Sequence, residues 1–416
     1  MVLYSLVVRL YGLIIHLAAW RKPKAAQWVQ GRKHWQYRLR NQLKSFPTKN
    51  RIWIHCASYG EFEQGRPLLE AIKQKHPGHT LVLSFFSPSG YEAFQDWKGA
   101  EVICYLPLDT RRNANEFLSI VNPQVAIFIK YEFWLHFLQA LHTKHIPTYL
   151  VSAVFKAHHP FFKWYGSIFR NSLRTFTTLF IQDEGSAKLL TKIGMNHYEI
   201  SGDTRFDRVL TVKERFEPNP IVQAYCANHK VMMAGSSWPK DEALLLEWYK
   251  ALNDSGTRLV LVPHEVDEKS IQNTVALVQK FGFSYTLYSG HSHDTNAQVL
   301  IVDAMGWLSK LYPYCHVAYI GGGFDSGLHN CLEPSVYGKP VLFYNGGHHH
   351  KFNEAIDLMS IGAAKAVQSA AELQQAWNHY TSSDSVAKVT AETLDRFFQK
   401  HAGSTQKLMQ AIPFGE

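Results

Sequence analysis

Short hydrophobic runs alternate with amphipathic stretches from residue 51 to about residue 370. The runs are rich in Val, Ile, Leu and Phe, which is typical of strands buried on both faces. The stretches between them, such as Glu63–Lys75 and Asn113–Val121, carry apolar residues at helical spacing. This alternation predicts an α/β fold in which parallel strands are joined by crossover helices.

The predicted strands form two series, separated by a break near Gly202–Val212. The first series is Ile52–Cys56, Thr80–Phe85, Val102–Tyr105, Val125–Ile129, Thr148–Ser152 and Leu179–Gln182; the second is Val231–Ala234, Arg258–Val262, Ser284–Leu287, Val299–Val302, Val317–Ile320, Val341–Phe343 and Ala363–Val367. We therefore expect two Rossmann-like domains that face a central cleft and bind ligands at the carboxyl ends of their strands. The predicted boundaries are 1–49, 50–208, 209–384 and 385–416, with the last segment forming helices that pack back on the first domain.

The first twenty residues predict a membrane-associated helix. Residues 2–20 are apolar except for a stripe of Ser5, Arg9, Gly12 and His16, spaced four, three and four apart. Nineteen helical residues would reach about 28 Å, but an arginine near the middle disfavours simple spanning. We expect this helix either to lie on the membrane surface or to serve as a single N-terminal membrane anchor. A buried core helix is the alternative interpretation of the same pattern.

Charge is concentrated in the same region. Residues 1–51 hold eleven Lys or Arg and no acid, whereas the remainder has a net charge of −2. This asymmetry favours an anionic membrane surface at one end and excludes nucleic acid spread over the whole surface. The five cysteines show no C-x-x-C spacing, which is typical of a reducing compartment.

The first domain offers two candidate acids after its predicted strands. Glu61 falls in the first turn of a helix that follows Ile52–Cys56, where the helix dipole favours a carboxylate able to accept a proton. Glu132 follows the strand that ends at Ile129, and either acid could instead be a solvated helix-start residue. The hydroxyls of Ser58, Ser87 and Ser89 lie in strand-to-helix turns, where they could bind a substrate or cap a helix.

The second domain contains a glycine-rich turn between residues 320 and 334. Gly322 and Gly323 would let backbone N–H groups approach a phosphate, while the carboxylate of Glu333 could accept from two ribose hydroxyls. The spacing fits neither G-x-G-x-x-G nor a P-loop, and a purely structural turn is the alternative. The other turns expected at this edge of the sheet contain Gly235, Ser236, His264, Met305 and Gly306. The run 348–350 of histidines does not outline a metal site, because consecutive residues point in different directions.

Taken in order, these motifs resemble the 3-deoxy-D-manno-octulosonic acid (Kdo) transferases of lipopolysaccharide biosynthesis, which have the GT-B glycosyltransferase fold. The matching segments cover roughly residues 50–365. They are ASYGE at 57–61, SFFSPSG at 84–90, YLPLD at 105–109, YEFW at 131–134, GDTRFD at 202–207, AGSS at 234–237, DAMG at 303–306 and GGG followed by HNCLEP at 321–334.

The resemblance implies transfer of Kdo from CMP-Kdo to a lipid A precursor, with inversion and without a metal or cofactor. It implies that Glu61 is the general base and Glu132 a second acid. It also implies that the donor is bound by Gly235, Ser236, His264, Met305, Gly306, Gly322, Gly323, Asn330 and Glu333, and the acceptor by Ser58, Ser87 and Ser89. The expected location is the cytoplasmic face of the bacterial inner membrane.

This chain departs from the family pattern at several positions. His264 stands where the family usually has an arginine near the leaving phosphate, and Glu265 stands where it usually has a histidine. Residues 131, 133, 135 and 136 differ from the usual Thr-Glu-Leu-Trp-Pro-Asn, and residues 152 and 154 differ from the usual Asn-Ala-Arg. Two alternatives stay open: a GT-B enzyme that uses a UDP-sugar on a lipid acceptor, and a membrane-peripheral nucleotide-binding module without enzymatic activity.

Overall fold

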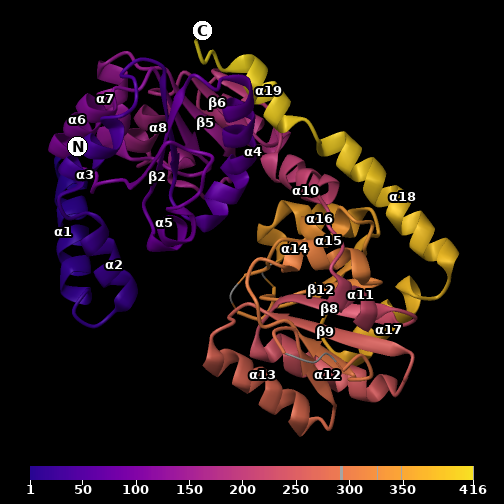
Figure 1. Ribbon diagram of the computed structural model, residues 1–416. Coiled ribbons are helices and arrows are strands. Elements are labelled where there is room, and N and C mark those ends of the chain that lie inside the picture. Colours follow the sequence, from indigo (N-terminus) through magenta and orange to yellow (C-terminus); the bar gives the residue numbers. More distant parts are fainter. Residues whose placement is uncertain (291–293, 326, 348, 416) are drawn as a thin grey trace. The chain divides into compact units, whose positions relative to one another are not determined.

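The computed structural model describes residues 1–290, 294–325, 327–347 and 349–415. The chain divides into two compact units (Figure 1). Unit 1 comprises Met1–Arg208 and His401–Glu416, and unit 2 comprises Val209–Lys400. Each unit contains one parallel sheet of seven strands.

The sheet of unit 1 has the strand order β3-β2-β1-β4-β5-β6-β7, and its paired strands are parallel. Six of these strands follow the Rossmann order, which reverses direction between β1 and β4. The strands are β1 Arg51–Cys56, β2 Thr80–Phe85, β3 Val102–Tyr105, β4 Val125–Ile129, β5 Thr148–Ala153, β6 Thr178–Ile181 and β7 Tyr198–Ile200.

Unit 2 repeats this arrangement with the order β10-β11-β9-β8-β12-β13-β14, again in parallel pairs. Its order reverses between β8 and β12. The strands are β8 Lys230–Ser237, β9 Thr257–Pro263, β10 Tyr285–Leu287, β11 Val299–Ile301, β12 Val317–Ile320, β13 Val341–Tyr344 and β14 Ala364–Val367. The predicted α/β class with two Rossmann-like domains is confirmed.

Helices connect the strands and cover the sheets. Unit 1 contains α1 Val2–Ala18, α2 Pro23–Gly31, α3 Trp35–Leu43, α4 Tyr59–Lys75, α5 Pro88–Phe94, α6 Arg111–Val121, α7 Leu135–Thr143, η1 Pro160–Phe162, α8 Ser167–Leu173, α9 Glu184–Lys192 and α19 Ser404–Ala411; α10 Thr204–Glu214 continues into unit 2, which contains α11 Pro220–Cys226, α12 Pro239–Leu252, α13 Glu268–Lys280, α14 Leu308–Leu311, η2 Tyr312–Tyr314, α15 Leu332–Ser335, η3 His349–Lys351, α16 Asn353–Ser360, α17 Ala370–Tyr380 and α18 Asp384–His401.

The last residues of the chain belong to unit 1, where α19 packs against α4. The Asp207 carboxylate fixes the start of this segment by accepting from the amides of Gly403 (2.7 Å) and Thr405 (2.6 Å). Leu408 and Phe414 then join the apolar core between α4 and the sheet. This return of the chain closes one face of the unit 1 sheet.

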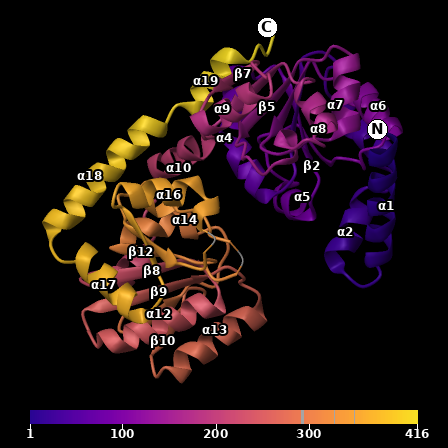
Figure 2. The same ribbon diagram turned by 180° about the vertical axis from the view of Figure 1, so that it is seen from behind.

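The side of helix α1 that packs on the body of unit 1 includes Ser5, Val8 and Gly12, so it contains half of the polar stripe. Arg9 and His16 of that stripe are exposed, and most of the apolar side faces solvent. Ser5 Oγ lies 2.8 Å from His136 Nε2, and Gly12 is buried so closely that a Cβ there would meet Leu108 at 2.8 Å. In both views α1 runs beside α2 at one edge of the unit (Figures 1 and 2). The outward side chains are Leu3, Leu6, Val7, Leu10, Leu13, Ile14 and Leu17, each more than half exposed. No helix in the described ranges is long and apolar enough to cross a membrane.

A buried arginine holds α2 to the sheet. The Arg32 guanidinium lies over the rings of Trp28 (3.9 Å), Phe86 (4.8 Å) and Tyr105 (4.8 Å). It also donates to the carbonyls of Trp28, Phe86 and Leu106. Burial lowers the pKa of Arg32 to about 9. The arrangement combines stacking with hydrogen bonds that only a planar guanidinium supplies.

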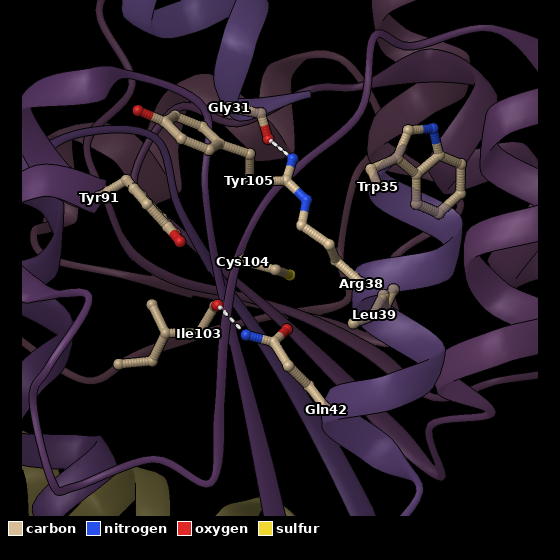
Figure 3. Close-up of a pocket in the computed structure, with 9 residues that line it drawn as sticks. All are labelled: Gly31, Trp35, Arg38, Leu39, Gln42, Tyr91, Ile103, Cys104 and Tyr105. Atoms are coloured by element: carbon tan, nitrogen blue, oxygen red, sulfur yellow. Dashed lines mark hydrogen bonds between the residues drawn. The ribbon is translucent and has the colours of Figure 1, made fainter. Parts of the chain in front are cut away.

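Figure 3 shows a small pocket between α3 and β3, close to this arginine. Arg38 donates to the carbonyl of Gly31 across its rim, and Gln42 donates to the carbonyl of Ile103 (3.4 Å). Its volume of 30 Å³ is enough for a water molecule rather than a substrate. Burial raises the pKa of the Cys104 thiol in its wall to about 12, so that thiol is not a nucleophile. This pocket is therefore packing around α3.

Candidate active site

The two predicted acids of unit 1 lie on neighbouring strands at the point where the strand order reverses. Glu61 follows β1 and Glu132 follows β4, and these strands pair in register from Ile52–Val125 to His55–Phe128. In open α/β sheets this position, at the carboxyl ends of the strands, is where ligands bind. The topology thus places both acids at the expected site of unit 1.

Glu61 is largely buried in the first turn of α4. Ser58 Oγ donates to its Oε2 over 2.7 Å, so this hydroxyl serves the carboxylate and does not cap the helix. Burial and then the charge of Glu132 raise the pKa of Glu61, and Ser58, His55 and Lys130 oppose that rise. We expected the helix dipole to favour the ionised form. Burial outweighs it, which makes the carboxylate a stronger base than an ordinary glutamate.

Two ring nitrogens, from Trp134 and His55, lie close to one oxygen of Glu132. Trp134 Nε1 donates to Oε2 over 2.6 Å, and His55 Nε2 lies 3.3 Å from the same atom. His55 is the last residue of β1 that pairs with β4 and is fully buried, whereas the Glu132 side chain is 12% exposed. The carboxylate therefore has a fixed orientation at the protein surface.

Polar contacts on both sides fix the ring of His55. Its Nδ1 lies 2.9 Å from Ser84 Oγ and 3.1 Å from the Ser84 carbonyl, and Trp53 Nε1 donates to the same hydroxyl (2.8 Å). On the other side, Trp134 Nε1 donates to His55 Nε2 over 3.0 Å, and this nitrogen also lies 3.3 Å from Glu132 Oε2. Both ring nitrogens of His55 therefore have partners.

The sequence analysis did not single out His55 or Ser84. A histidine inside the apolar run of residues 52–56 is most often a satisfied core residue. Its one signal was that a polar side chain interrupts an otherwise buried strand next to Glu61. Only the pairing of β1 with β4 shows that it reaches Glu132.

A pocket of 440 Å³ opens beside Glu132. Aromatic residues supply much of its wall, including Tyr4 from α1, Trp134 from the loop after β4, and Phe161 from η1. Aromatic rings beside a carboxylate suit a sugar, whose faces stack and whose hydroxyls accept or donate hydrogen bonds. The remaining lining residues are Tyr131, Phe133, His159, Pro160 and Phe169.

Ser87 and Ser89 cap a helix. Ser87 Oγ accepts from the amide of Ser89 over 3.2 Å at the start of α5, and the two hydroxyl oxygens lie 2.8 Å apart. This is the capping alternative that the sequence left open. Ser89 is exposed and Ser87 is partly buried, and their contact with an acceptor stays a prediction.

In unit 2 the predicted donor residues also gather at the reversal of strand order. Gly235 and Ser236 end β8, and Gly322 and Gly323 follow β12, its neighbour in the sheet. Ser236 has a left-handed backbone (φ 51°) where the pairing of β8 with β9 shifts register. Strained backbone of this kind clusters at ligand sites.

The glycines of this turn are required by backbone packing. A Cβ on Gly235 would lie 2.0 Å from the hydroxyl of Tyr312, and one on Gly323 would lie 2.3 Å from the carbonyl of Tyr344. Gly322 has φ 92°, and its amide donates to Asp241 Oδ2 over 3.0 Å. That bond occupies an amide that we expected to face a phosphate. The structural alternative therefore accounts for these glycines, and their phosphate contacts stay predictions.

His264 lies in a stack of three rings. Its ring is 4.7 Å from Trp238 and 4.5 Å from His329, with interplanar angles of 27° and 29°. Burial lowers the pKa of His264, and burial together with His264 lowers the pKa of His329 to about 4. Both rings are therefore neutral near pH 7. His264 does not supply the positive charge of the arginine usual at this position.

Asn330 and Glu333 lie together at the start of α15, where Asn330 Nδ2 donates to Glu333 Oε1 over 3.2 Å. Nearby, the hydroxyl of Tyr337 is buried and has no hydrogen-bond partner among the described residues. Burial, and then Glu333, raise the pKa of Tyr337 to about 12. Met305 is exposed, and Gly306 has a left-handed backbone (φ 82°).

The histidine run of residues 348–350 falls partly outside the described residues, since His348 is not among them. His349 and His350 lie in η3. Within the described residues, no group of three His, Cys, Asp or Glu side chains is placed to hold a metal ion.

The chain has two Rossmann-like units, and its candidate residues lie where the strand order of each sheet reverses. Unit 1 has two acids at this switch point and unit 2 has a glycine turn, an arrangement that defines a GT-B type protein. A family model described as 3-deoxy-D-manno-octulosonic-acid transferase (kdotransferase) matches residues 33–208. The chain is 27% identical to the 3-deoxy-D-manno-octulosonic acid transferase of Aquifex aeolicus, over 78% of this chain and 84% of that one. The resemblance is confirmed: the chain is a glycosyltransferase similar to Kdo transferases.

A second relative and a solved structure extend the comparison. A bifunctional glycosyltransferase/methyltransferase of Fusobacterium nucleatum is 26% identical over 74% of this chain, and the match spans about half (49%) of that protein. The crystal structure of UDP-GlcNAc 2-epimerase from Neisseria meningitidis has a TM-score of 0.62, with 14% identity over 86% of this chain and 98% of that one. That likeness supports the GT-B fold alone.

Proposed function

We propose that this chain transfers Kdo from CMP-Kdo to a lipid A precursor, with Glu61 as the general base. The observation that carries the proposal is the buried Glu61 beside Glu132 at the switch point of unit 1, within the segment matched by the Kdo transferase model. Unit 2, with its turn after β12, would hold the donor nucleotide.

In the proposed reaction, a primary hydroxyl of the acceptor sugar attacks the anomeric carbon of Kdo. The new carbon–oxygen bond forms as the bond from that carbon to the phosphate oxygen breaks, and CMP leaves with the electron pair. The hydroxyl proton passes to Glu61. Its raised pKa suits this role, because a base is most effective when its pKa approaches the working pH.

Glu132 has two roles in the proposal. Its charge raises the pKa of Glu61, and its fixed carboxylate would orient the acceptor in the aromatic pocket. His55 is a positioning residue, because it contacts Glu132 and not the substrate in this arrangement. Trp134 Nε1 lies within hydrogen-bond distance of the same oxygen and of His55 Nε2, so the three side chains form one cluster.

The test is mass spectrometry of the acceptor lipid after incubation with CMP-Kdo or with a set of UDP-sugars. We expect a mass increase of one or more Kdo residues with CMP-Kdo alone. Turnover with a UDP-sugar would replace the donor assignment. Nucleotide binding without turnover under any condition would favour the binding-module alternative.

We also propose that unit 1 binds the surface of the inner membrane through α1. The support is the outward apolar side of this helix, together with the basic residues that follow it. Apolar burial in the interface is not screened by salt, so binding should survive moderate salt.

Replacing Leu6, Leu10 and Leu13 by serine keeps the side of α1 that packs on the body. This triple variant should lose co-flotation with vesicles while its melting temperature stays near that of the parent. The matched control replaces the exposed Val389 of α18 in unit 2 by serine. Undiminished flotation of the α1 variant would contradict the proposal.

A further inference from the structure

A basic hollow lies on unit 1 beside α1, outside the candidate active site. Its volume is 460 Å³, and three arginines from two helices line it: Arg9 from α1, and Arg111 and Arg112 from the first turn of α6. Ser5, Thr110, Asn115 and His136 complete the wall. We call this set of seven residues the arginine hollow.

The positive charge of the arginine hollow is not neutralised by the protein. Within the described ranges none of the three arginines forms an ion pair. The nearby acid, Asp109, is buried and accepts from the hydroxyl of Tyr4 and from two backbone amides, so its oxygens are already used. The hollow therefore contains three guanidinium groups that have no ion-pair partner among the described residues.

Several positive charges from α1 and α6 act on His136 in the wall of the hollow. Burial lowers the pKa of His136, and after an opposing effect of Asp109 the chain's amino terminus, Arg111 and Arg9 lower it further. Arg111 and Arg112 also occupy the first turn of α6, which contains no acid. Cations at a helix N-terminus oppose the helix dipole, and a bound anion would relieve that repulsion.

We propose that the arginine hollow binds the phosphate headgroup of an anionic phospholipid in the bilayer on which α1 lies. Guanidinium groups match the geometry of phosphate oxygens and can bind them in pairs. The bilayer is the source because Arg9 shares its helix with the outward apolar side chains Leu6, Leu10 and Leu13. That helix places headgroup-binding and acyl-facing side chains at one surface. The inference rests on the proposed membrane association.

The test compares flotation with vesicles of phosphatidylcholine alone and of phosphatidylcholine with phosphatidylglycerol. In the triple variant R9Q/R111Q/R112Q, partition onto the anionic vesicles should fall about 100-fold, since each arginine near an anionic surface contributes roughly fivefold. Partition onto the neutral vesicles should stay unchanged. The matched control K144Q/K188Q/K192Q removes the same charge from exposed lysines of unit 1 and should change partition less than about 3-fold.

Equal losses in the two triple variants would overturn the arginine hollow as a specific site. A parent protein that binds neither vesicle would overturn it together with the membrane proposal. A second assay measures turnover of the parent and of both variants with an acceptor dispersed in neutral detergent, where no bilayer is present. Loss of membrane binding with normal turnover in detergent would leave the proposed transferase reaction intact. If the acceptor KM rises in the arginine variant under that condition, the hollow binds a phosphate of the acceptor and the bilayer assignment is wrong.

Discussion

Replacing Glu61 by glutamine separates its chemical role from its structural one. The amide keeps the shape and can still accept from Ser58 Oγ, which lies 2.7 Å from the carboxylate, but it cannot take the acceptor's proton. General bases contribute roughly 10²–10⁴-fold, so kcat should fall by about that factor while CMP binding is kept.

The same substitution should not destabilise the fold. Burial and Glu132 raise the pKa of Glu61, which means that the folded state disfavours its charged form. The stability gained by keeping this carboxyl protonated is fully present below its ordinary value of 4.5 and is lost as pH rises through the raised pKa. At neutral pH the uncharged glutamine therefore melts at the same temperature as the parent or higher. This advantage should disappear at acid pH.

The assay combines turnover of CMP-Kdo and lipid acceptor with calorimetric CMP binding and thermal melts across pH. Glu63→Gln is the matched control. It removes a carboxylate from the same helix, and that carboxylate forms ion pairs with Arg66 and Arg208. Its kcat should be unchanged and its stability lower by at most ~1 kcal/mol per pair. A Glu61→Gln variant that turns over within a few-fold of the parent, or that melts markedly lower, would refute the assignment of Glu61 as the buried base.

Three further substitutions test the rest of the structure. His55→Phe removes the ring nitrogen that contacts Glu132 and should lower turnover ~10–150-fold. His55→Gln keeps an N–H group and should retain most of the parent's turnover. Equal losses of turnover in the two variants would argue against a positioning role for His55. Arg32→Lys should lower the free energy of unfolding, measured in urea, by ~1–3 kcal/mol. The control substitution Arg21→Lys, at an exposed position, should lower it by less than ~0.5 kcal/mol. Equal effects of the two substitutions would contradict the stacked arrangement of Arg32. Glu333→Ala should weaken calorimetric CMP binding ~10–150-fold, and unchanged affinity would place the nucleotide elsewhere.

Much of the fold could be predicted because buried parallel strands leave continuous apolar runs. The expected strand Val125–Ile129 coincides with β4, and Ile52–Cys56 lacks only the first residue of β1. Strand β7, Tyr198–Ile200, was missed because it has three residues at an exposed sheet edge and little apolar pattern. The other edge strands β3, β10 and β14 were predicted, so the weak apolar pattern of β7 explains why it was missed.

The orientation of α1 could not be predicted from its own residues. Its stripe of polar and small residues marks one face, but sequence cannot say whether that face meets solvent or protein. The answer depends on Ser5 meeting His136, 131 positions later, and on Gly12 meeting Leu108. His55 escaped prediction for the same reason, since its partner Glu132 is reached only across the sheet.

The glycines of the turn after β12 have a structural cause that the sequence pattern could not separate from phosphate binding. Ser236 adopts a left-handed backbone at the bulge that ends β8, and this brings its carbonyl to within 2.2 Å of where a Cβ on Gly321 would lie. Only glycine fits there, so the neighbouring strand must end in one whether or not a phosphate binds. Because Asp241 already holds the amide of Gly322, the proposed donor site would depend more on side chains such as Glu333 than on the glycines.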